Sequence, residues 1–354
     1  MSEFKDIKTF DQSDLKPWFR SPDSRLAEGI TYINETDTLY WIDILKGEIH
    51  RLKKLTASGG EFKEENYNYL VLQDSNYVRD AKVKNPGISL DFNESVGVIF
   101  PDHSNDNIVL FGSRYGIGRC DLDIGTWEYI LLYSESTEVD HDRVLRLRSN
   151  DGNISPCGKY IYIGLMNDFP LELKDEGCVL KIDLNGKTAE ERIKVIWPRI
   201  KIPNAIHWNA DGSLMYLTDS LSFTIWEYNE SENTKKKLID IKKSNNLDIL
   251  SPEPDGSAVD ISTGLLYTAV WSTRKVQVYQ LKDGKLVQEI LLPNNTPRIS
   301  CCCIVGNDLF VTTGNMDTLE GEKVSNDTVG GCIYRVRNII PNGAKFSSKV
   351  QLKY

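Results

Sequence analysis

The chain has 354 residues, of which 40% are apolar and 26% are charged, the balance of an ordinary globular protein rather than a disordered one. Its formal net charge of -9 argues against a nucleic-acid partner, because phosphate backbones are bound by basic surfaces. No window reaches the roughly 18 apolar residues of a membrane span, and the first 19 residues lack the apolar core of a secretion signal. We therefore expect no membrane partner and a location in the cytoplasm, with the nucleus as a second compartment.

The cysteines and histidines restrict the chemistry further. The seven cysteines are odd in number and include no Cys-x-x-Cys pair, so they do not read as a disulfide framework. The run Cys301, Cys302 and Cys303 predicts a buried strand, and a redox or thiolate-metal role is the minor alternative. The four histidines show no metal-ligand spacing. Any bound metal is therefore expected to have mainly oxygen ligands.

Repetition is the strongest signal along the chain. A strand, a polar turn and an aromatic or β-branched strand recur, followed by a second turn and a further strand. Six such units, at roughly the spacing of propeller blades, occur at residues 29–52, 87–123, 153–184, 205–229, 257–281 and 300–336.

This pattern predicts an all-β protein, a six-bladed β-propeller with four-stranded antiparallel blades. We expect one propeller domain over residues 21–354, preceded by an N-terminal arm over residues 1–20. The Lys/Glu/Asn-rich region at about 53–80 is expected to be an insertion that extends the first blade, with one strand near residues 69–73. The basic stretch 230–246 is expected to be a solvated hairpin.

Polar residues stand at one recurring place in the repeat, just before the expected innermost strand of four blades. They are Glu28 in LAEGITY, Arg148, Asn150 and Asp151 in RSNDGNISP, Asn204 in IPNAIHW, and Asp255 in EPDGSAVD. Loops that enter the innermost strands gather at one mouth of the channel, so these side chains are expected to converge.

Two interpretations of these positions stay open. Asn-Asp-Gly, Pro-Asn and Pro-Asp-Gly are ordinary turn sequences, so each segment taken singly reads as a turn. The recurrence at one place favours a site instead. A Glu, Asn and Asp set offers only oxygen donors, which suits Ca²⁺ or Mg²⁺, or Mn²⁺ and Zn²⁺ with water completing the coordination sphere.

The sequence resembles the senescence marker protein, regucalcin and gluconolactonase family of six-bladed propeller lactonases. The matching segments follow in order across nearly the whole chain: LAEGITY, YWIDILKGEIHRL, RSNDGNISPCGKYIYIGLM, PNAIHWNADGSLMYLTDS, PDGSAVDISTGLLYTAVW and TPRISCCCIVGNDLFVTTG. The third of these, with its Arg-x-Asn-Asp-Gly, is the most specific.

The resemblance implies that Glu28, Asn204 and Asp255 hold one divalent cation, and that Arg148 and Asn150 contact a sugar substrate. It also implies that Asp255 is the general base. Asp168 is the carboxylate nearest to the position of the family's acidic substrate contact.

These residues predict a metal-dependent hydrolase that opens a small-molecule sugar lactone. The metal would polarise the carbonyl, and Asp255 or a metal-bound hydroxide would activate water. The absence of a Gly-x-Ser-x-Gly segment argues against a serine hydrolase. A non-catalytic calcium-binding regulatory protein and a propeller scaffold for protein partners are the alternatives.

Overall fold

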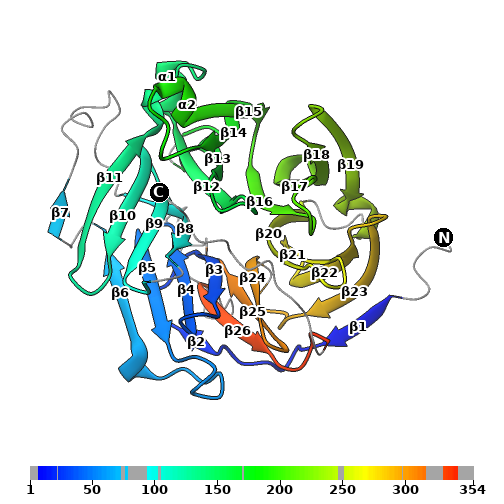
Figure 1. The fold of residues 1–354 in the computed structure, drawn as a ribbon. Coiled ribbons are helices and arrows are strands. Elements are labelled where there is room, and N and C mark those ends of the chain that lie inside the picture. Colours follow the sequence, from blue (N-terminus) through cyan, green and yellow to red (C-terminus); the bar gives the residue numbers. More distant parts are fainter. Residues whose placement is uncertain are drawn as a thin grey trace. The chain divides into compact units, whose positions relative to one another are not determined.

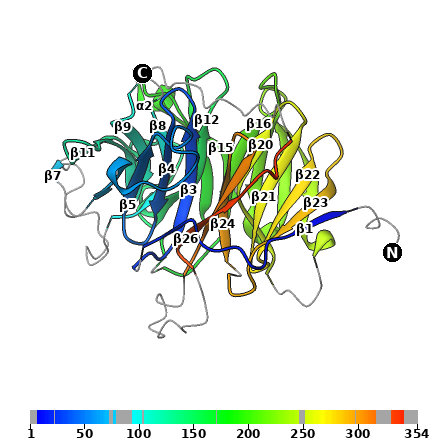
Figure 2. The same ribbon diagram turned by 90° about the horizontal axis from the view of Figure 1, so that it is seen from below.

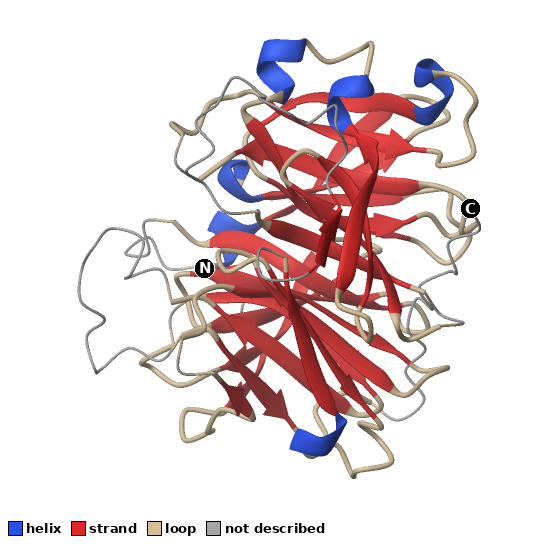
Figure 3. Ribbon diagram, turned by 90° about the vertical axis from the view of Figure 1, so that its left-hand side faces the viewer, coloured by secondary structure: helices blue, strands red, loops and turns tan. Residues whose placement is uncertain are grey.

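The computed structural model describes residues 7–21, 23–72, 76–78, 94–102, 105–169, 171–245, 251–296, 298–315 and 330–341. Regular structure in these residues is almost entirely β-strand, and the helices are single short turns (Figure 3). The helices are η1 (Glu64–Asn66), η3 (Tyr133–Glu135), α1 (His141–Val144), α2 (Ala189–Arg192), η4 (Ser220–Ser222) and η5 (Ile241–Ser244).

The described strands form six sheets (Figure 1). In five of these sheets, four strands that follow one another in the chain are neighbours, and two of the five have one further strand at the edge. The sixth sheet has three consecutive strands and one strand from the N-terminal segment. The first sheet contains β3 (Ala27–Ile33), β4 (Thr38–Asp43), β5 (Glu48–Lys53) and β6 (Tyr67–Val71). The second contains β8 (Val96–Pro101), β9 (Ile108–Ser113), β10 (Gly116–Asp121) and β11 (Thr126–Leu132), with β7 (Asn76–Val78) at the edge. The third contains β12 (Leu147–Ile154), β13 (Ile161–Asn167), β14 (Gly177–Ile182) and β15 (Ile193–Ile200).

The other three sheets repeat the arrangement. The fourth sheet contains β16 (Pro203–Trp208), β17 (Met215–Asp219), β18 (Thr224–Asn229) and β19 (Thr234–Asp240). The fifth contains β20 (Glu253–Asp260), β21 (Leu265–Trp271), β22 (Lys275–Gln280) and β23 (Lys285–Leu291), with β1 (Lys8–Asp11) at the edge. The sixth contains β24 (Ile299–Val305), β25 (Asp308–Thr313) and β26 (Cys332–Val336), together with β2 (Phe19–Arg20). The predicted fold class, a six-bladed β-propeller with four-stranded antiparallel blades, is confirmed.

The segment before the first sheet supplies strands to sheets formed late in the chain. β2 pairs antiparallel with β26, through Phe19 with Ile333 and Arg20 with Cys332, and completes the sixth sheet. β1 pairs parallel with β23 and adds a fifth strand to the fifth sheet, where Figure 2 shows the two side by side. The arm expected at residues 1–20 thus contributes two strands among its described residues.

The region expected to be an insertion in the first blade supplies the fourth strand of that blade. β6 begins at Tyr67, two residues before the expected strand, and pairs antiparallel with β5. Residues 73–75 and 79–80 of this region lie outside the described residues. The basic stretch forms the hairpin of β18 and β19, where Lys235, Lys236 and Lys237 are exposed.

Two compact units divide the chain. The first unit contains residues 1–32 and 209–348, and the second contains residues 33–208 and 349–354. In the second unit, Val98 and Leu110 of the second sheet pack with Ile154 and Ile163 of the third in one buried cluster. Each fully buried side chain of this kind contributes about 1.5–3 kcal/mol to folding.

The first unit has a matching core between its fifth and sixth sheets. Val276 and Val278 share a buried cluster with Ile304, Val311 and Tyr334. Packing of neighbouring sheets through alternating apolar side chains holds the first strands of both sheets in register. Polar side chains on those first strands are therefore carried by a rigid framework.

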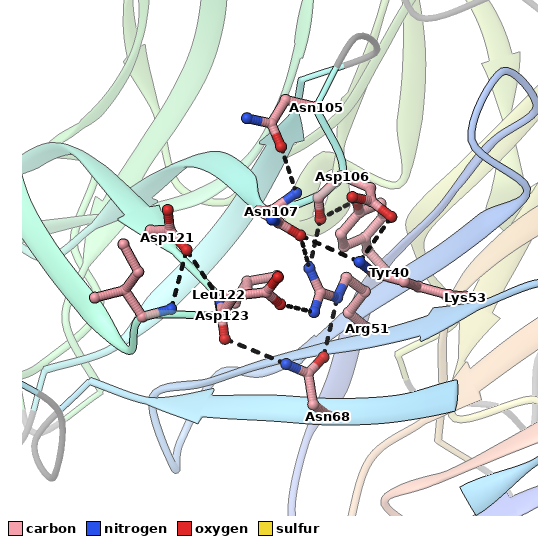
Figure 4. A network of polar contacts seen from close by, with 11 residues as sticks. Tyr40, Arg51, Lys53, Asn68, Asn105, Asp106, Asn107, Asp121, Leu122 and Asp123 are labelled. Carbon is pink, nitrogen blue, oxygen red and sulfur yellow. Dashed lines mark hydrogen bonds and ion pairs between the residues drawn. The ribbon is translucent and has the colours of Figure 1, made fainter. Parts of the chain in front are cut away.

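A polar network ties the outer part of the first sheet to the loops of the second (Figure 4). Arg51 is buried, and its Nε donates to Asn68 Oδ1 at 2.9 Å. Its Nη1 donates to the backbone oxygen of Asp106 and to Asn107 Oδ1, both at 2.8 Å, and its Nη2 pairs with Asp123 at 2.5 Å. Arg51 thus pairs with Asp123, and Lys53 pairs with the carboxylate of Asp106 at 3.0 Å. We interpret this network as structural, because its charges are balanced within it.

The cysteines behave as the sequence predicts. All seven lie among the described residues and none of them forms a disulfide. Cys301 and Cys302 are buried in β24, and Cys303 is half-buried. Burial raises the pKa of the Cys302 thiol well above its usual range, so it stays protonated and unreactive near neutral pH. None of the helices in the described ranges has the length and apolar character needed to cross a bilayer.

Candidate functional site

The predicted site residues lie inside the first strands of four sheets. Glu28 and Arg148 are the second residues of β3 and β12, Asn204 is the second residue of β16, and Asp255 is the third of β20. The expectation that they stand in the loops before these strands is wrong by two or three residues, because strand pairing begins earlier than the turn-like sequences suggest. The predicted recurrence is still present, because these residues stand at the second or third position of the first strand in each of the four sheets.

A β-bulge follows Arg148 in the third sheet. The register of β12 against β13 shifts between Ser149 and Gly152, so Asn150 and Asp151 oppose a single residue of the partner strand. Bulges re-aim side chains and are frequent beside active sites. The Asn-Asp-Gly sequence, which has the composition of a turn, forms this bulge.

Two sheets of the first unit carry the same irregularity. The register of β20 shifts around Asp255 and Gly256, and that of β24 shifts around Ser300 and Cys301. Asn150, Asp255 and Ser300 therefore occupy equivalent bulge positions. Ser300 was missed in the sequence because Cys-Cys-Cys, with no Asx-Gly pair, gives no turn signal.

Arg148 is the most enclosed of the predicted residues, with 1% of its side chain exposed. Its Nη1 donates to the backbone oxygen of Ser149 at 2.6 Å and lies 3.4 Å from Asn150 Oδ1. Its Nη2 lies 3.4 Å from Met166 Sδ, and the guanidinium carbon lies 4.0 Å from the centroid of the Phe169 ring. These contacts fix the plane of the guanidinium.

Asp168, directly after β13, joins two arginines. Its Oδ2 lies 2.9 Å from Nε of Arg114, and its Oδ1 lies 3.8 Å from Nε of Arg148. The backbone N–H of Phe169 donates to Oδ1 at 2.9 Å. Arg114 comes from the turn between β9 and β10. No local sequence pattern connects it with Asp168, because the contact depends on how two sheets pack.

Asn150 links the third sheet to the strand that carries Asn204. Its Nδ2 donates to the backbone oxygen of Pro203 at 3.0 Å. The next residue, Asn204, is buried, and its Oδ1 accepts the backbone N–H of Ala205 at 3.0 Å. Asp151 accepts the N–H of Gly152 at 2.6 Å in the same way.

Glu28 and Asp255 belong to the first unit. Glu28 is buried, and its Oε2 accepts the backbone N–H of Gly29 at 2.8 Å, which fixes one carboxylate oxygen. Asp255 is half-buried at its bulge. Nearby, Ser300 Oγ donates to the backbone oxygen of Ala27, the residue before Glu28, at 2.6 Å.

Arg148 thus lies beside Asn150 and faces Asp168 within the second unit. The predicted metal ligands are divided, with Glu28 and Asp255 in the first unit and Asn204 in the second. Within the described ranges, no group of three or more His, Cys, Asp or Glu side chains is arranged to hold a metal. The predicted metal ligands are two carboxylates, Glu28 and Asp255, and the amide of Asn204. A metal site formed by these three residues stays a prediction.

Comparison with known proteins places the chain in a defined group. The family model described as SMP-30/Gluconolactonase/LRE-like region matches residues 26–315. An uncharacterised protein of Saccharomyces cerevisiae is 44% identical over 360 residues, which cover 98% of each chain.

Solved structures share the fold at low identity. The chain is similar to a regucalcin of Agrobacterium tumefaciens, described as a calcium-binding protein, with a TM-score of 0.68 and 19% identity over 98% of this chain and 99% of the other. It is also similar to a gluconolactonase of Xanthomonas campestris, with a TM-score of 0.58 and 16% identity over 91% and 88% of the two chains. At such identities the similarity concerns the fold.

Proposed function

Because the chain belongs to the SMP-30/gluconolactonase/LRE-like family, we propose that it is a divalent-metal-dependent hydrolase that opens a sugar lactone. The observation that supports this most is the recurrent bulge, which sets Asn150 beside the enclosed Arg148 and gives Asp255 the equivalent place in the fifth sheet. A few polar groups held in fixed positions are what orients a small molecule in its binding site.

The proposed metal ligands are Glu28, Asn204 and Asp255. All three offer oxygen, and one oxygen of Glu28 and that of Asn204 are each oriented by a backbone N–H of the next residue. This donor set fits Ca²⁺, Mg²⁺, Mn²⁺ or Zn²⁺, without selecting one of them. A cation bound there would act as a Lewis acid toward the substrate carbonyl.

The chain's own side chains bind and orient the substrate. The fixed guanidinium of Arg148 and the amide of Asn150 offer donors to sugar hydroxyls, which would hold the ring in one pose. Asp255, as a half-buried carboxylate, would accept a proton from the attacking water. The water oxygen bonds to the carbonyl carbon, the ring C–O bond breaks, and the departing ring oxygen gains a proton, giving the open hydroxy acid.

The test is hydrolysis of glucono-δ-lactone by the purified chain with each of the four cations, against the spontaneous rate. We expect acceleration with at least one cation, and a loss of about 100-fold or more in kcat for Asp255→Asn. Asp283→Asn is the matched control, because Asp283 caps a turn through Lys285 and should leave kcat unchanged. No acceleration by any cation, or full activity of Asp255→Asn, would refute the proposal.

A second candidate is a calcium-binding regulatory protein without turnover, and the structural similarity to a regucalcin described as calcium-binding favours it. Arg148 argues against it, because calcium binding alone gives no role to an enclosed arginine that lies beside the amide of Asn150. Calcium binding with no lactone hydrolysis under any of the conditions above would support this alternative.

A further inference from the structure

Arg114 is a buried arginine outside the predicted set of site residues. It lies in the turn between β9 and β10, where only 2% of its side chain is exposed. Arginine is almost never buried unless it is paired. Its Nε lies 2.9 Å from Asp168 Oδ2, and its guanidinium carbon lies 5.4 Å from the centroid of the Tyr115 ring.

Asp168 has both carboxylate oxygens engaged within the protein. Oδ2 faces Arg114, while Oδ1 accepts the Phe169 N–H and faces Nε of Arg148 at 3.8 Å. This arrangement suits an internal anchor between two cations better than a group that contacts a sugar.

We infer that Arg114 is a positioning residue, which fixes Asp168 and through it holds Arg148 in the orientation that binds substrate. The inference rests on the proposed function, since it assigns Arg148 to the substrate. Arg148 meets Ser149, Asn150 and Met166 on its Nη side and Asp168 on its Nε side. Loss of the contact between Nε and Asp168 would let the guanidinium of Arg148 rotate away from its fixed plane.

A double-mutant cycle on KM distinguishes a positioning role of Arg114 from a role that only stabilises the fold. We expect Arg114→Gln to raise the KM for glucono-δ-lactone at least about fivefold and to change kcat much less, a size typical of coupled neighbours in one ion-pair network. Arg148→Lys should raise KM at least as much. In the double variant the two effects should not multiply, because both act on the same guanidinium contact.

Arg51→Gln is the matched control. Arg51 is also a buried arginine of the second unit, with 4% of its side chain exposed and a carboxylate partner, but it belongs to the outer network of Figure 4. Its loss should lower stability to urea while leaving KM unchanged. If Arg114→Gln does not fold, Arg114→Lys is used, which keeps the charge and should show a smaller rise in KM.

A readout without substrate keeps this inference distinct from the proposed function. The side-chain Nε–H signals of arginine, observed by ¹⁵N NMR and assigned with Arg148→Lys, report the environment of Arg148 directly. We expect the Arg148 signal to shift or broaden in Arg114→Gln and to stay in place in Arg51→Gln. An unchanged Arg148 signal, or multiplying effects on KM, would overturn the inference. Absence of lactone turnover in the unmodified protein would instead refute the proposed function.

Discussion

The guanidinium carbon of Arg148 lies 4.0 Å from the centroid of the Phe169 ring. Asp168, which faces Nε of the same arginine, directly precedes Phe169 in the chain. A cation over an aromatic face in a buried place contributes about 0.5–2 kcal/mol. We expect Phe169→Leu to raise the KM for a sugar lactone about threefold to tenfold, with kcat nearly unchanged, in steady-state kinetics.

The control for this prediction is Tyr160→Leu. Tyr160 also lies under a cation, with Lys181 Nζ 4.4 Å from its ring centroid, but it belongs to the connection between β12 and β13. Its replacement should leave KM at the level of the unmodified protein. A folded Phe169→Leu variant with unchanged KM would show that the ring does not help to orient Arg148.

The ion pair of Arg146 with Glu176 predicts a pH-dependent stability. Arg146 donates to both carboxylate oxygens, at 2.7 and 3.1 Å, and this pairing, with the amide of Asn167, lowers the pKa of Glu176 to about 2. A lowered pKa stabilises the folded state above the ordinary glutamate pKa of about 4.3. This stabilisation is lost as the pH falls toward 2.

Glu176→Gln should therefore be less stable than the unmodified protein. The difference should be only about 1 kcal/mol, because 38% of the Arg146 side chain is exposed and solvent screens the pair. In urea unfolding, the difference should be constant from about pH 7 to pH 5 and should shrink below about pH 4.3. With Arg146→Gln as the background, Glu176→Gln should show almost no pH-dependent difference. A difference that grows on acidification would contradict the assignment.

The fold could be predicted from the sequence because each blade is a local unit. Strands such as β4 and β5 are joined by a short turn, so apolar alternation and turn residues within about 20 positions describe them. The parallel edge strand β1 could not be found in this way, since its partner β23 lies far along the chain and its residues Lys8–Asp11 show little apolar character.

The candidate site was predicted in part for the same reason. Asn150 and Asp255 stand in Asx-Gly segments, and the sequence marked the places where these strands bulge without distinguishing a bulge from a turn. Ser300 has no such mark. Arg114 contributes through the packing of the second sheet against the third, and that relationship is absent from any local pattern.

Gly256 is predicted to be essential for the bulge that carries Asp255. A β-carbon added there would lie 2.5 Å from Cys301 Sγ and 2.8 Å from the Cys301 α-carbon, closer than real contacts. Since a backbone atom cannot move as a side-chain end can, Gly256→Ala should cost about 2 kcal/mol or more in urea unfolding. It should also lower lactone turnover, because Asp255 would shift.

Gly125→Ala separates the steric effect from the conformational one. Gly125 has a φ of 73° and open space around it, so its replacement should cost only about 1 kcal/mol for the left-handed backbone. Turnover by Gly125→Ala should be unchanged. If Gly256→Ala were no less stable than Gly125→Ala, the close packing of β20 against β24 would not constrain the site.

Metal binding can be followed by thermal unfolding, without substrate. A cation that binds only the folded state stabilises it by about 2.7 kcal/mol at 100 times its Kd, so after chelator treatment Tm should rise when cation is returned. Glu28→Gln should abolish most of this rise. Glu172→Gln, at a glutamate whose side chain is 80% exposed, should keep it in full.

Asn204 provides the sharpest form of this experiment. Its side chain is buried, so Asn204→Asp places a carboxylate where desolvation is costly and should lower Tm in the chelator-treated protein. The same carboxylate is a stronger cation ligand than the amide, so added cation should raise Tm more in Asn204→Asp than in the unmodified protein. Asn204→Leu should lose the response. An equal rise in all three proteins would show that Asn204 does not hold the metal.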